Sequence, residues 1–170
     1  MKITIITVSF NSAATIQKTF NSVKNQTYPN IEYIVVDGHS TDGAQKIIKE
    51  NQDLIDKWVS EPDEGLYDAM NKGIKMATGD IIGILNSDDT FYDEKVLEKI
   101  ANFHLQNYIQ ASVGNIKQYN KKGKHKRTYS SRYWLPEKLR IGFMPPHPSI
   151  FFEKELFEKF GYYKLDFVIG

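Results

Sequence analysis

The fold is decided by the stretch Gly79-Asp80-Ile81-Ile82-Gly83-Ile84-Leu85-Asn86-Ser87-Asp88-Asp89, a short apolar run that ends in two adjacent carboxylates. A continuous aliphatic run of this kind is typical of a strand that is buried on both faces of a parallel sheet. Ligands of open α/β sheets bind outside the carboxyl ends of such strands. We therefore expect Asp88 and Asp89 to lie where a cation or a substrate hydroxyl would bind.

The chain before this stretch alternates between strand-like and helix-like patterns. Strands are expected over residues 3–8, 31–36 and, more weakly, 54–60, and helices over 13–25, 44–51 and 66–77. The last helix is the best patterned, because its apolar residues recur at the spacing of one helix face, and Gly79 is expected as the cap just past its end. Alternation of this kind predicts an α/β fold, with a Rossmann-like, mostly parallel sheet flanked by helices.

Beyond Asp89 the pattern becomes mixed. A helix is expected over residues 93–106, two strands over 111–119 and 127–134 around a polar turn, a strand over 150–152 and a helix over 153–160. No internal repeat or low-complexity linker separates this part from the first. We therefore expect a single domain, residues 1–170, with a nucleotide-type half over 1–92 and a mixed half over 93–170.

The composition is that of an ordinary globular protein, with 41% hydrophobic and 25% charged residues. A net charge of +1 gives no reason to expect a nucleic-acid partner. The absence of cysteine excludes disulfides and thiolate metal sites. The apolar run at the N-terminus is too short for a signal peptide, and no run approaches the roughly 20 residues of a membrane span. We expect a cytoplasmic domain.

Three polar turns follow apolar strands and should meet at one edge of the sheet: Val8-Ser9-Phe10, Asp37-Gly38 and Asp88-Asp89. Such a meeting suggests a binding crevice. Strand ends are often polar in any case, and for Asp37 both interpretations stay open. The Asp88-Asp89 pair is more specific, because adjacent carboxylates repel each other and a cation relieves that repulsion.

The chain lacks both common phosphate-binding loops, G-x-x-x-x-G-K-[ST] and, after the first strand, G-x-G-x-x-G. A diphosphate would then have to be neutralised by a metal ion rather than by backbone amides. Carboxylate oxygens with open positions suit Mg²⁺ or Mn²⁺ shared with a diphosphate, so we expect one of these ions as the cofactor.

Four motifs, in order over almost the whole chain, resemble family-2 glycosyltransferases with the GT-A nucleotide-sugar fold. They are the opening Ile-Ile-Thr-Val-Ser-Phe-Asn with Gln26-Thr27-Tyr28, the segment Val-Val-Asp-Gly-His-Ser-Thr-Asp-Gly at 35–43, the helix at 65–74 with its Tyr-Asp-Ala-Met-Asn, and Asn86-Ser87-Asp88-Asp89. Each motif alone is weak, but their order and spacing make the resemblance specific. It implies the N-terminal portion of such a catalytic domain, with residues 93–170 as its acceptor-side half.

The resemblance implies where a nucleotide-diphospho-sugar donor would bind. Val8 and Phe10 would contact the base, Asp88 the ribose and diphosphate, and Asp89 the metal ion, with Asp88 as a second candidate metal ligand. The other donor contacts would come from Ser9, Asp37, Gly38, Asp68, Asn71 and Ser87.

Two departures from the family pattern leave questions open. Many members carry a second aspartate, which reads the nucleobase, where this chain has Gly38, so the base stays unidentified. Many also carry Arg-Asn in the third helix, where this chain has Met70-Asn71. Asp63 and Asp68 could replace part of that network, although Asp68 could equally be an exposed helix residue.

His147, between prolines and before a strand, resembles a family histidine that faces the diphosphate, which makes it a candidate third metal ligand; an ordinary loop histidine is the alternative. The basic residues between Lys121 and Arg127 could contact an anionic membrane or a lipid-linked acceptor, or form a solvated hairpin tip. Three aromatic residues of this half could line an acceptor groove or belong to the core: Tyr133, Trp134 and Phe143.

The function implied is transfer of a hexosyl unit from a nucleotide-diphospho-sugar to an acceptor hydroxyl, with inversion and a divalent metal, in surface polysaccharide synthesis. The acceptor would be a saccharide or a lipid-linked saccharide at the inner face of the membrane. Inverting transfer needs a general base, which by register is expected beyond Gly170, so this chain could bind the donor and transfer sugar only feebly. The alternatives are a sugar-phosphate nucleotidyltransferase and a non-catalytic nucleotide-sugar-binding fragment.

Overall fold

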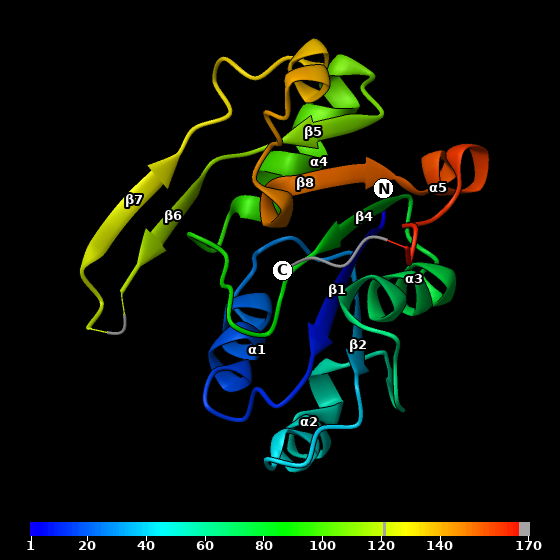
Figure 1. Ribbon diagram of the computed structural model, residues 1–170, viewed down its shortest axis with the longest axis vertical. Helices are drawn as coiled ribbons and strands as arrows, with labels where there is room; N and C mark the ends of the chain where they lie inside the picture. Colours follow the sequence, from blue (N-terminus) through cyan, green and yellow to red (C-terminus); the bar gives the residue numbers. More distant parts are fainter. Residues whose placement is uncertain (121, 167–170) are drawn as a thin grey trace.

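The computed structural model describes residues 1–120 and 122–166, and a six-stranded sheet forms its centre (Figure 1). The strands of this sheet are β1 Ile3–Ser9, β2 Ile31–Asp37, β3 Lys57–Ser60, β4 Ile81–Ile84, β5 Ala111–Val113 and β8 Ile150–Glu153. The helices that flank it are α1 Ile16–Lys24, α2 Ala44–Glu50, α3 Leu66–Met76, α4 Val96–Asn107 and α5 Lys154–Phe160.

The strands lie in the order β3-β2-β1-β4-β8-β5, and the first four along the chain run parallel. The two strands from the second half extend the sheet in the antiparallel sense, β8 beside β4 and β5 beside β8. The prediction of a mostly parallel sheet flanked by helices is confirmed. The run at 81–85, which decides the fold, lies inside the sheet between β1 and β8.

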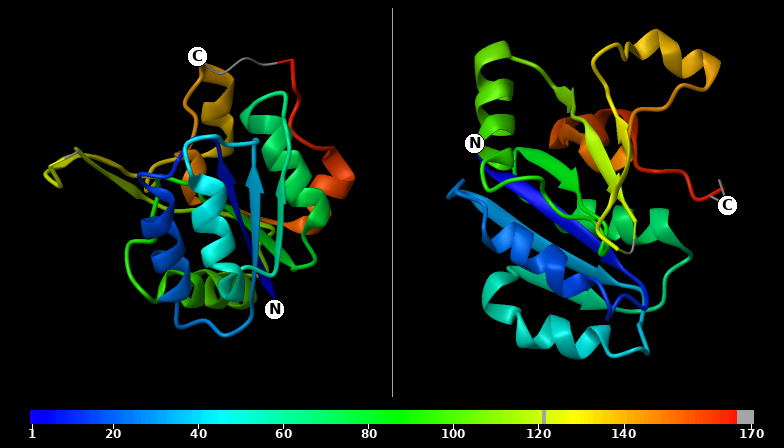
Figure 2. Two further views of the ribbon diagram at one scale, coloured as in Figure 1. Left: turned by 90° about the horizontal axis from the view of Figure 1, so that it is seen from below. Right: turned by 90° about the vertical axis from the view of Figure 1, so that its left-hand side faces the viewer.

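Alternate residues of β1 supply two hydrophobic layers, because successive side chains of a strand point to opposite faces. Ile3 and Ile5 pack with residues of α1, α2 and α4 on one face, while Ile6 and Val8 pack with residues of α3 and α5 on the other. Figure 2 shows the helices on the two sides of the sheet. All of β1 is therefore buried, as its unbroken β-branched sequence predicts.

A hairpin of β6 (Ile116–Tyr119) and β7 (His125–Tyr129) stands apart from the sheet (Figure 1). It is followed by the 3₁₀ turns η2 (Pro136–Ile141) and η3 (His147–Ser149). Several apolar side chains of this region are more than half exposed: Tyr133, Leu135, Ile141, Phe143 and Met144. Tyr133 and Phe143 are thus not core residues. In the described ranges 1–120 and 122–166, no helix has both the length and the apolar composition needed to cross a bilayer.

Two predicted strands of the second half have different bounds in the structure. The strand predicted over 111–119 is divided in two: β5 belongs to the central sheet and β6 to the hairpin. At the break, the Gly114 N–H donates to the Ser149 carbonyl at 2.9 Å, and Asn115 Oδ1 accepts a hydrogen bond from the Ser131 N–H at 2.8 Å. The second predicted strand, 127–134, corresponds to β7, which starts at His125 and already ends at Tyr129.

Some boundaries of the first half also differ from the prediction. Gln52–Leu54 form a 3₁₀ turn, η1, so the third strand starts at Lys57, and α1 starts at Ile16 instead of residue 13. Gly79 is not the helix cap, because α3 already ends where Ala77 becomes extended, with φ −65° and ψ 139°. Glycine is required at 79 for space, since a Cβ there would lie 2.8 Å from the Thr4 backbone nitrogen.

A buried carboxylate joins three segments near the amino ends of the strands. Glu32 is 2% exposed, and its oxygens accept hydrogen bonds from Thr4 Oγ1 (2.7 Å), Lys57 Nζ (2.9 Å), the Thr78 N–H (2.7 Å) and Thr78 Oγ1 (2.8 Å). Burial alone raises the pKa of Glu32, but these four bonds together outweigh it and lower the pKa to about 2. The ionised carboxylate therefore ties β2 to β1, to β3 and to the loop after α3.

Candidate functional site

The ends of β1, β2 and β4 meet at one edge of the sheet, as expected. Ser9 pairs with Asp37, and the Gly38 N–H donates to the Ser9 carbonyl at 2.8 Å. On the other side of β1, the Ser87 N–H donates to the Val8 carbonyl at 3.2 Å. The structure therefore brings together the predicted donor residues that follow the strands: Val8, Ser9, Asp37, Gly38 and Ser87.

The acidic turn after β4 is held by contacts of its backbone. The Asp89 N–H donates to the Asn86 carbonyl at 3.0 Å, and Thr19 Oγ1 of α1 donates to the Asp89 carbonyl at 2.8 Å. Asp88 is exposed, whereas Asp89 is partly buried. The two adjacent carboxylates therefore lie in different environments.

Asp89 carries a charge that the protein does not compensate. Burial raises its pKa, repulsion from Asp88 raises it further, and a hydrogen bond from Asn86 Nδ2 at 3.3 Å lowers it, so that the pKa is about 6. In the described part of the chain, neither carboxylate forms an ion pair. The neighbouring Asn86 Oδ1 is buried and has no hydrogen-bond partner there. These oxygens fit a divalent cation, which would lower the pKa of Asp89.

Asp37 has a structural role that the sequence left open. It is fully buried, and its carboxylate accepts hydrogen bonds from the Ser40 N–H (2.9 Å), the Ser40 hydroxyl (2.5 Å) and the Ser60 hydroxyl (2.7 Å). The Ser9 hydroxyl is similarly engaged with the Ser12 hydroxyl at 2.7 Å. The Asp37 side chain therefore shapes the loop after β2 and links it to β3.

Two α3 residues expected at the donor, Asp68 and Asn71, bind other parts of the chain. Asp68 Oδ2 lies 3.2 Å from Lys72 Nζ and accepts a hydrogen bond from the Glu64 N–H at 3.2 Å. The Asn71 amide donates to the Tyr163 carbonyl at 2.8 Å and accepts from the Tyr163 N–H at 2.9 Å. The Asp68 contacts position the loop before α3, and the two Asn71 hydrogen bonds hold the segment after α5 against α3.

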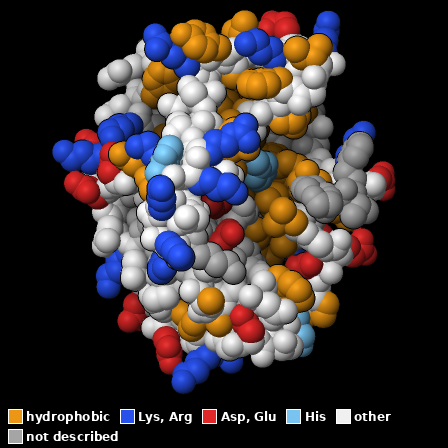
Figure 3. All heavy atoms as spheres, turned by 60° about the vertical axis from the view of Figure 1, so that its left-hand side comes forward, with side chains coloured by type: hydrophobic (Ala, Val, Ile, Leu, Met, Phe, Trp, Pro, Cys, Tyr) orange, Lys and Arg blue, Asp and Glu red, His pale blue; other side chains and the backbone are white. Residues whose placement is uncertain are grey.

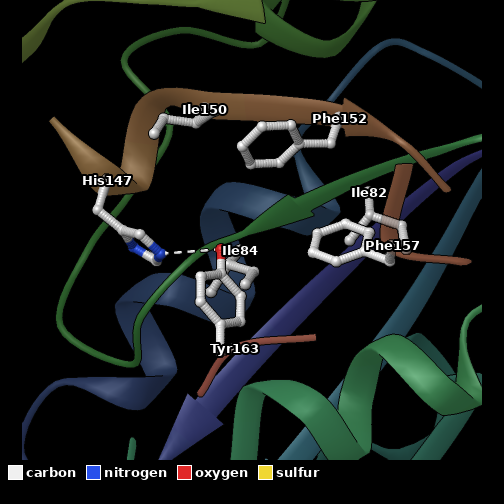
Figure 4. Close-up of a pocket in the computed structure, with 7 residues that line it drawn as sticks. All are labelled: Ile82, Ile84, His147, Ile150, Phe152, Phe157 and Tyr163. Carbon is white, nitrogen blue, oxygen red and sulfur yellow. Dashed lines mark hydrogen bonds between the residues drawn. The ribbon is translucent and has the colours of Figure 1, made fainter. Parts of the chain in front are cut away.

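Tyr163 is a site residue that reasoning from the sequence missed. Its ring stacks on Tyr67 of α3 with the ring centroids 5.2 Å apart, and its hydroxyl lies 3.3 Å from His147 Nε2 (Figure 4). Burial, with a smaller contribution from Tyr67, raises the pKa of the Tyr163 phenol to about 12. The only signal in the sequence was an aromatic pair after Gly161, which is compatible with many roles.

His147 is not grouped with the acidic turn. Its ring points into a small pocket of about 10 Å³, lined also by Ile82, Ile84, Ile150, Phe152, Phe157 and Tyr163 (Figure 4). Burial lowers the pKa of the imidazole. No group of three His, Asp or Glu side chains suited to a metal occurs in residues 1–120 and 122–166, so the expected set of Asp88, Asp89 and His147 is not assembled. The η3 turn and the Tyr163 hydroxyl hold the imidazole at the pocket instead.

The sheet and its polar edge define the class of protein. The structure superimposes on S. aureus TarS 1–349 with a TM-score of 0.82 and 21% identity, over 98% of this chain and 51% of that one. It is also similar to the mannosyltransferase PcManGT from Pyrobaculum calidifontis, in complex with GDP-Man and Mn²⁺, with a TM-score of 0.75 and 21% identity over 97% of this chain and 48% of that one. The fold is that of the GT-A nucleotide-sugar glycosyltransferases.

The chain belongs to glycosyltransferase family 2, because residues 4–161 match the family model for Glycosyl transferase family 2. A Mycobacterium tuberculosis protein described as an uncharacterized glycosyltransferase is 33% identical over 99% of this chain and 64% of its own length. A PGL/p-HBAD biosynthesis glycosyltransferase of Mycobacterium bovis is 34% identical over 58% of this chain and 40% of its own length. The chain therefore spans less than two thirds of each of these two relatives.

Proposed function

We propose that this protein binds a nucleotide-diphospho-sugar at the carboxyl edge of the sheet and, with Mn²⁺ or Mg²⁺, transfers the hexosyl unit to an acceptor hydroxyl with inversion. The observation that carries the proposal is the turn at 86–89, where an uncompensated, partly buried Asp89 stands beside the exposed Asp88. TarS has been solved with UDP-GlcNAc, and PcManGT with GDP-Man and Mn²⁺. Their shared fold supports this type of donor and a divalent metal.

The residues of the turn would act on the diphosphate end of the donor. Asp89, with Asp88 beside it, would hold the cation, which when bound supplies positive charge to stabilise the diphosphate leaving group. Phe10 projects from the end of β1 with 67% of its surface exposed, which offers a ring face to the base. Attack of the acceptor hydroxyl on the anomeric carbon also needs a general base, to take the proton of that hydroxyl.

For the acceptor we propose a saccharide or a lipid-linked saccharide used in surface polysaccharide synthesis at the inner face of the membrane. Figure 3 shows Lys and Arg side chains gathered on one face of the molecule. The hairpin carries four exposed basic residues: Lys122, Lys124, Lys126 and Arg127. Lys121, the first residue of the predicted basic run, lies outside the described residues. Basic side chains on the hairpin, together with exposed apolar side chains in segment 133–144, suit an anionic lipid surface.

Calorimetric titration with UDP, GDP, CDP and ADP, each with and without MnCl₂, tests the proposal. We expect at least one nucleotide to bind about tenfold more tightly with Mn²⁺, because the carboxylates of the turn would hold a cation whose charge offsets that of the diphosphate. Asp89→Asn should remove this gain, whereas Asp53→Asn, an exposed residue of η1, should keep it. If the wild type binds none of the four nucleotides with Mn²⁺, the proposal is wrong.

Sugar transfer is measured separately, with labelled nucleotide-sugars and membrane lipid extracts as acceptors. Product with an inverted anomeric configuration would support the enzymatic function. Metal-dependent nucleotide binding without any product from a full set of donors and acceptors would favour the alternative of a nucleotide-sugar-binding fragment.

A further inference from the structure

A carboxylate from another loop occupies the space above Gly38. Gly38 follows β2 and has no side chain of its own, and a Cβ built there would collide with Asp63 Oδ2 before any other atom. The next neighbour of that point is the ring of Phe10, whose Cδ2 lies 3.3 Å away. A carboxylate oxygen and an exposed aromatic ring therefore meet over one backbone position at the edge where the three strands end.

Asp63 is held in place with one oxygen unused. Its Oδ1 accepts a hydrogen bond from the Gly65 N–H at 2.9 Å, which closes a tight turn before α3. Gly65 has φ +112°, a conformation that glycine adopts readily and other residues adopt rarely. Among the described residues, Oδ2 of Asp63 has no hydrogen bond and no ion pair. This oxygen is thus available to a ligand that lies on the Phe10 ring.

The loop that carries Asp63 is fixed at both ends. The Glu61 N–H donates to the Asp37 carbonyl at 3.0 Å, which joins the loop to β2. Lys72 Nζ of α3 donates to the Pro62 carbonyl at 3.0 Å and lies 3.0 Å from Glu61 Oε1. These contacts set the position of the carboxylate before any ligand arrives, which is what a selective site needs.

We infer that Asp63 is the residue that selects the nucleobase of the donor, by accepting a hydrogen bond from a ring N–H of a base stacked on Phe10. A carboxylate only accepts hydrogen bonds. Uracil, thymine and guanine present a ring N–H beside a carbonyl, whereas cytosine and adenine present a nitrogen lone pair at the corresponding edge. The donor is then a uridine, thymidine or guanosine diphospho-sugar, and UDP serves as the probe for the first two because uracil and thymine present the same N–H edge. This inference rests on the proposed function, since it identifies the base of the same donor.

The Asp63 carboxylate should strongly disfavour the binding of cytosine and adenine. A lone pair facing the Asp63 carboxylate is repelled, and the carboxylate would lie against the edge of the base without a hydrogen-bond donor. Sites that hydrogen-bond a ligand group reject analogues that lack it far more strongly than apolar pockets reject a missing methyl group. We therefore expect UDP or GDP to bind at least about tenfold more tightly than CDP and ADP.

The test compares Asp63→Asn with the wild type, residues 1–170, by calorimetric titration with UDP, GDP, CDP and ADP in MnCl₂. Asparagine keeps the oxygen that accepts from the Gly65 N–H, so the turn should remain. Its amide can also donate to cytosine, so binding of UDP or GDP should weaken about tenfold and the preference over CDP should shrink. Glu64→Gln is the matched control, because it removes the same charge from an exposed neighbour and should leave the preference unchanged.

The possible outcomes distinguish the role of Asp63, the selection of the base and the proposed function. An unchanged preference in Asp63→Asn, with an unchanged melting temperature, would overturn the role of Asp63. Equal binding of all four nucleotides by the wild type would overturn base selection at this site while leaving the proposed function in place. Binding of none of them with Mn²⁺ would overturn the proposed function and this inference with it.

Discussion

Replacing Glu32 with glutamine should lower the free energy of unfolding by about 2–3 kcal/mol at neutral pH. The pKa of Glu32 is about 2 in the folded protein and 4.5 in the reference state, a difference that corresponds to about 3 kcal/mol. The Lys57 side chain is 38% exposed, and solvent screening reduces its share. A glutamine amide nitrogen cannot accept a hydrogen bond, so it would leave a buried donor at Thr4 or Thr78 without a partner.

The pH dependence has a definite sign. Because folding lowers the pKa of this carboxyl, its contribution to stability is complete above about pH 4.5 and is lost as the pH falls toward 2. The wild type should therefore lose about 2–3 kcal/mol of unfolding free energy over that range through this residue. The Glu32→Gln variant should lack this part of the acid dependence, and the two curves should converge near pH 2.

Urea unfolding at pH 7, 4 and 2.5, followed by fluorescence of Trp58 and Trp134, measures both quantities. At pH 7 the variant should also melt about 5–10 °C below the wild type, as expected for a domain of this size. Glu155→Gln, an exposed change on α5, should stay within about 0.5 kcal/mol of the wild type at each pH. A Glu32→Gln variant as stable as the wild type at pH 7, or a deficit that persists unchanged at pH 2.5, would refute the reasoning.

Three further changes test the site. Asn71→Ala removes both hydrogen bonds to the Tyr163 backbone, so it should cost about 1–3 kcal/mol and speed hydrogen exchange at the Tyr163 amide; unchanged exchange would contradict this role of Asn71. Burial lowers the pKa of His147, so stability should fall as the pH drops below 6.5, and an NMR titration that gives the folded imidazole a pKa above 6.5 would contradict this sign. Gly38→Ser should push the Asp63 carboxylate aside and narrow the preference for UDP or GDP over CDP, as titration with MnCl₂ can show.

Local pattern in the sequence determined the α/β fold and the position of the acidic turn. The runs that became β1, β2 and β4 are rich in β-branched and aliphatic residues, and such runs need burial on both faces whatever their partners are. The apolar residues of α3 recur with the period of a helix, which is also a local property of the sequence. Once these strands run parallel, their carboxyl ends lie on one edge, so Asp37 and the turn at 86–89 had to lie at that edge.

The tertiary structure alone decided what individual side chains do at that edge. Asn71 meets Tyr163 across 92 positions of sequence, and the Asp63 carboxylate stands over Gly38 because α3 holds its loop there. His147 points into the pocket beside Tyr163, and among the described residues it is not grouped with Asp88 and Asp89. The physical reason is that the partner of a polar side chain is set by segments that pack against it from distant parts of the chain. Spacing along the sequence carries no record of that packing.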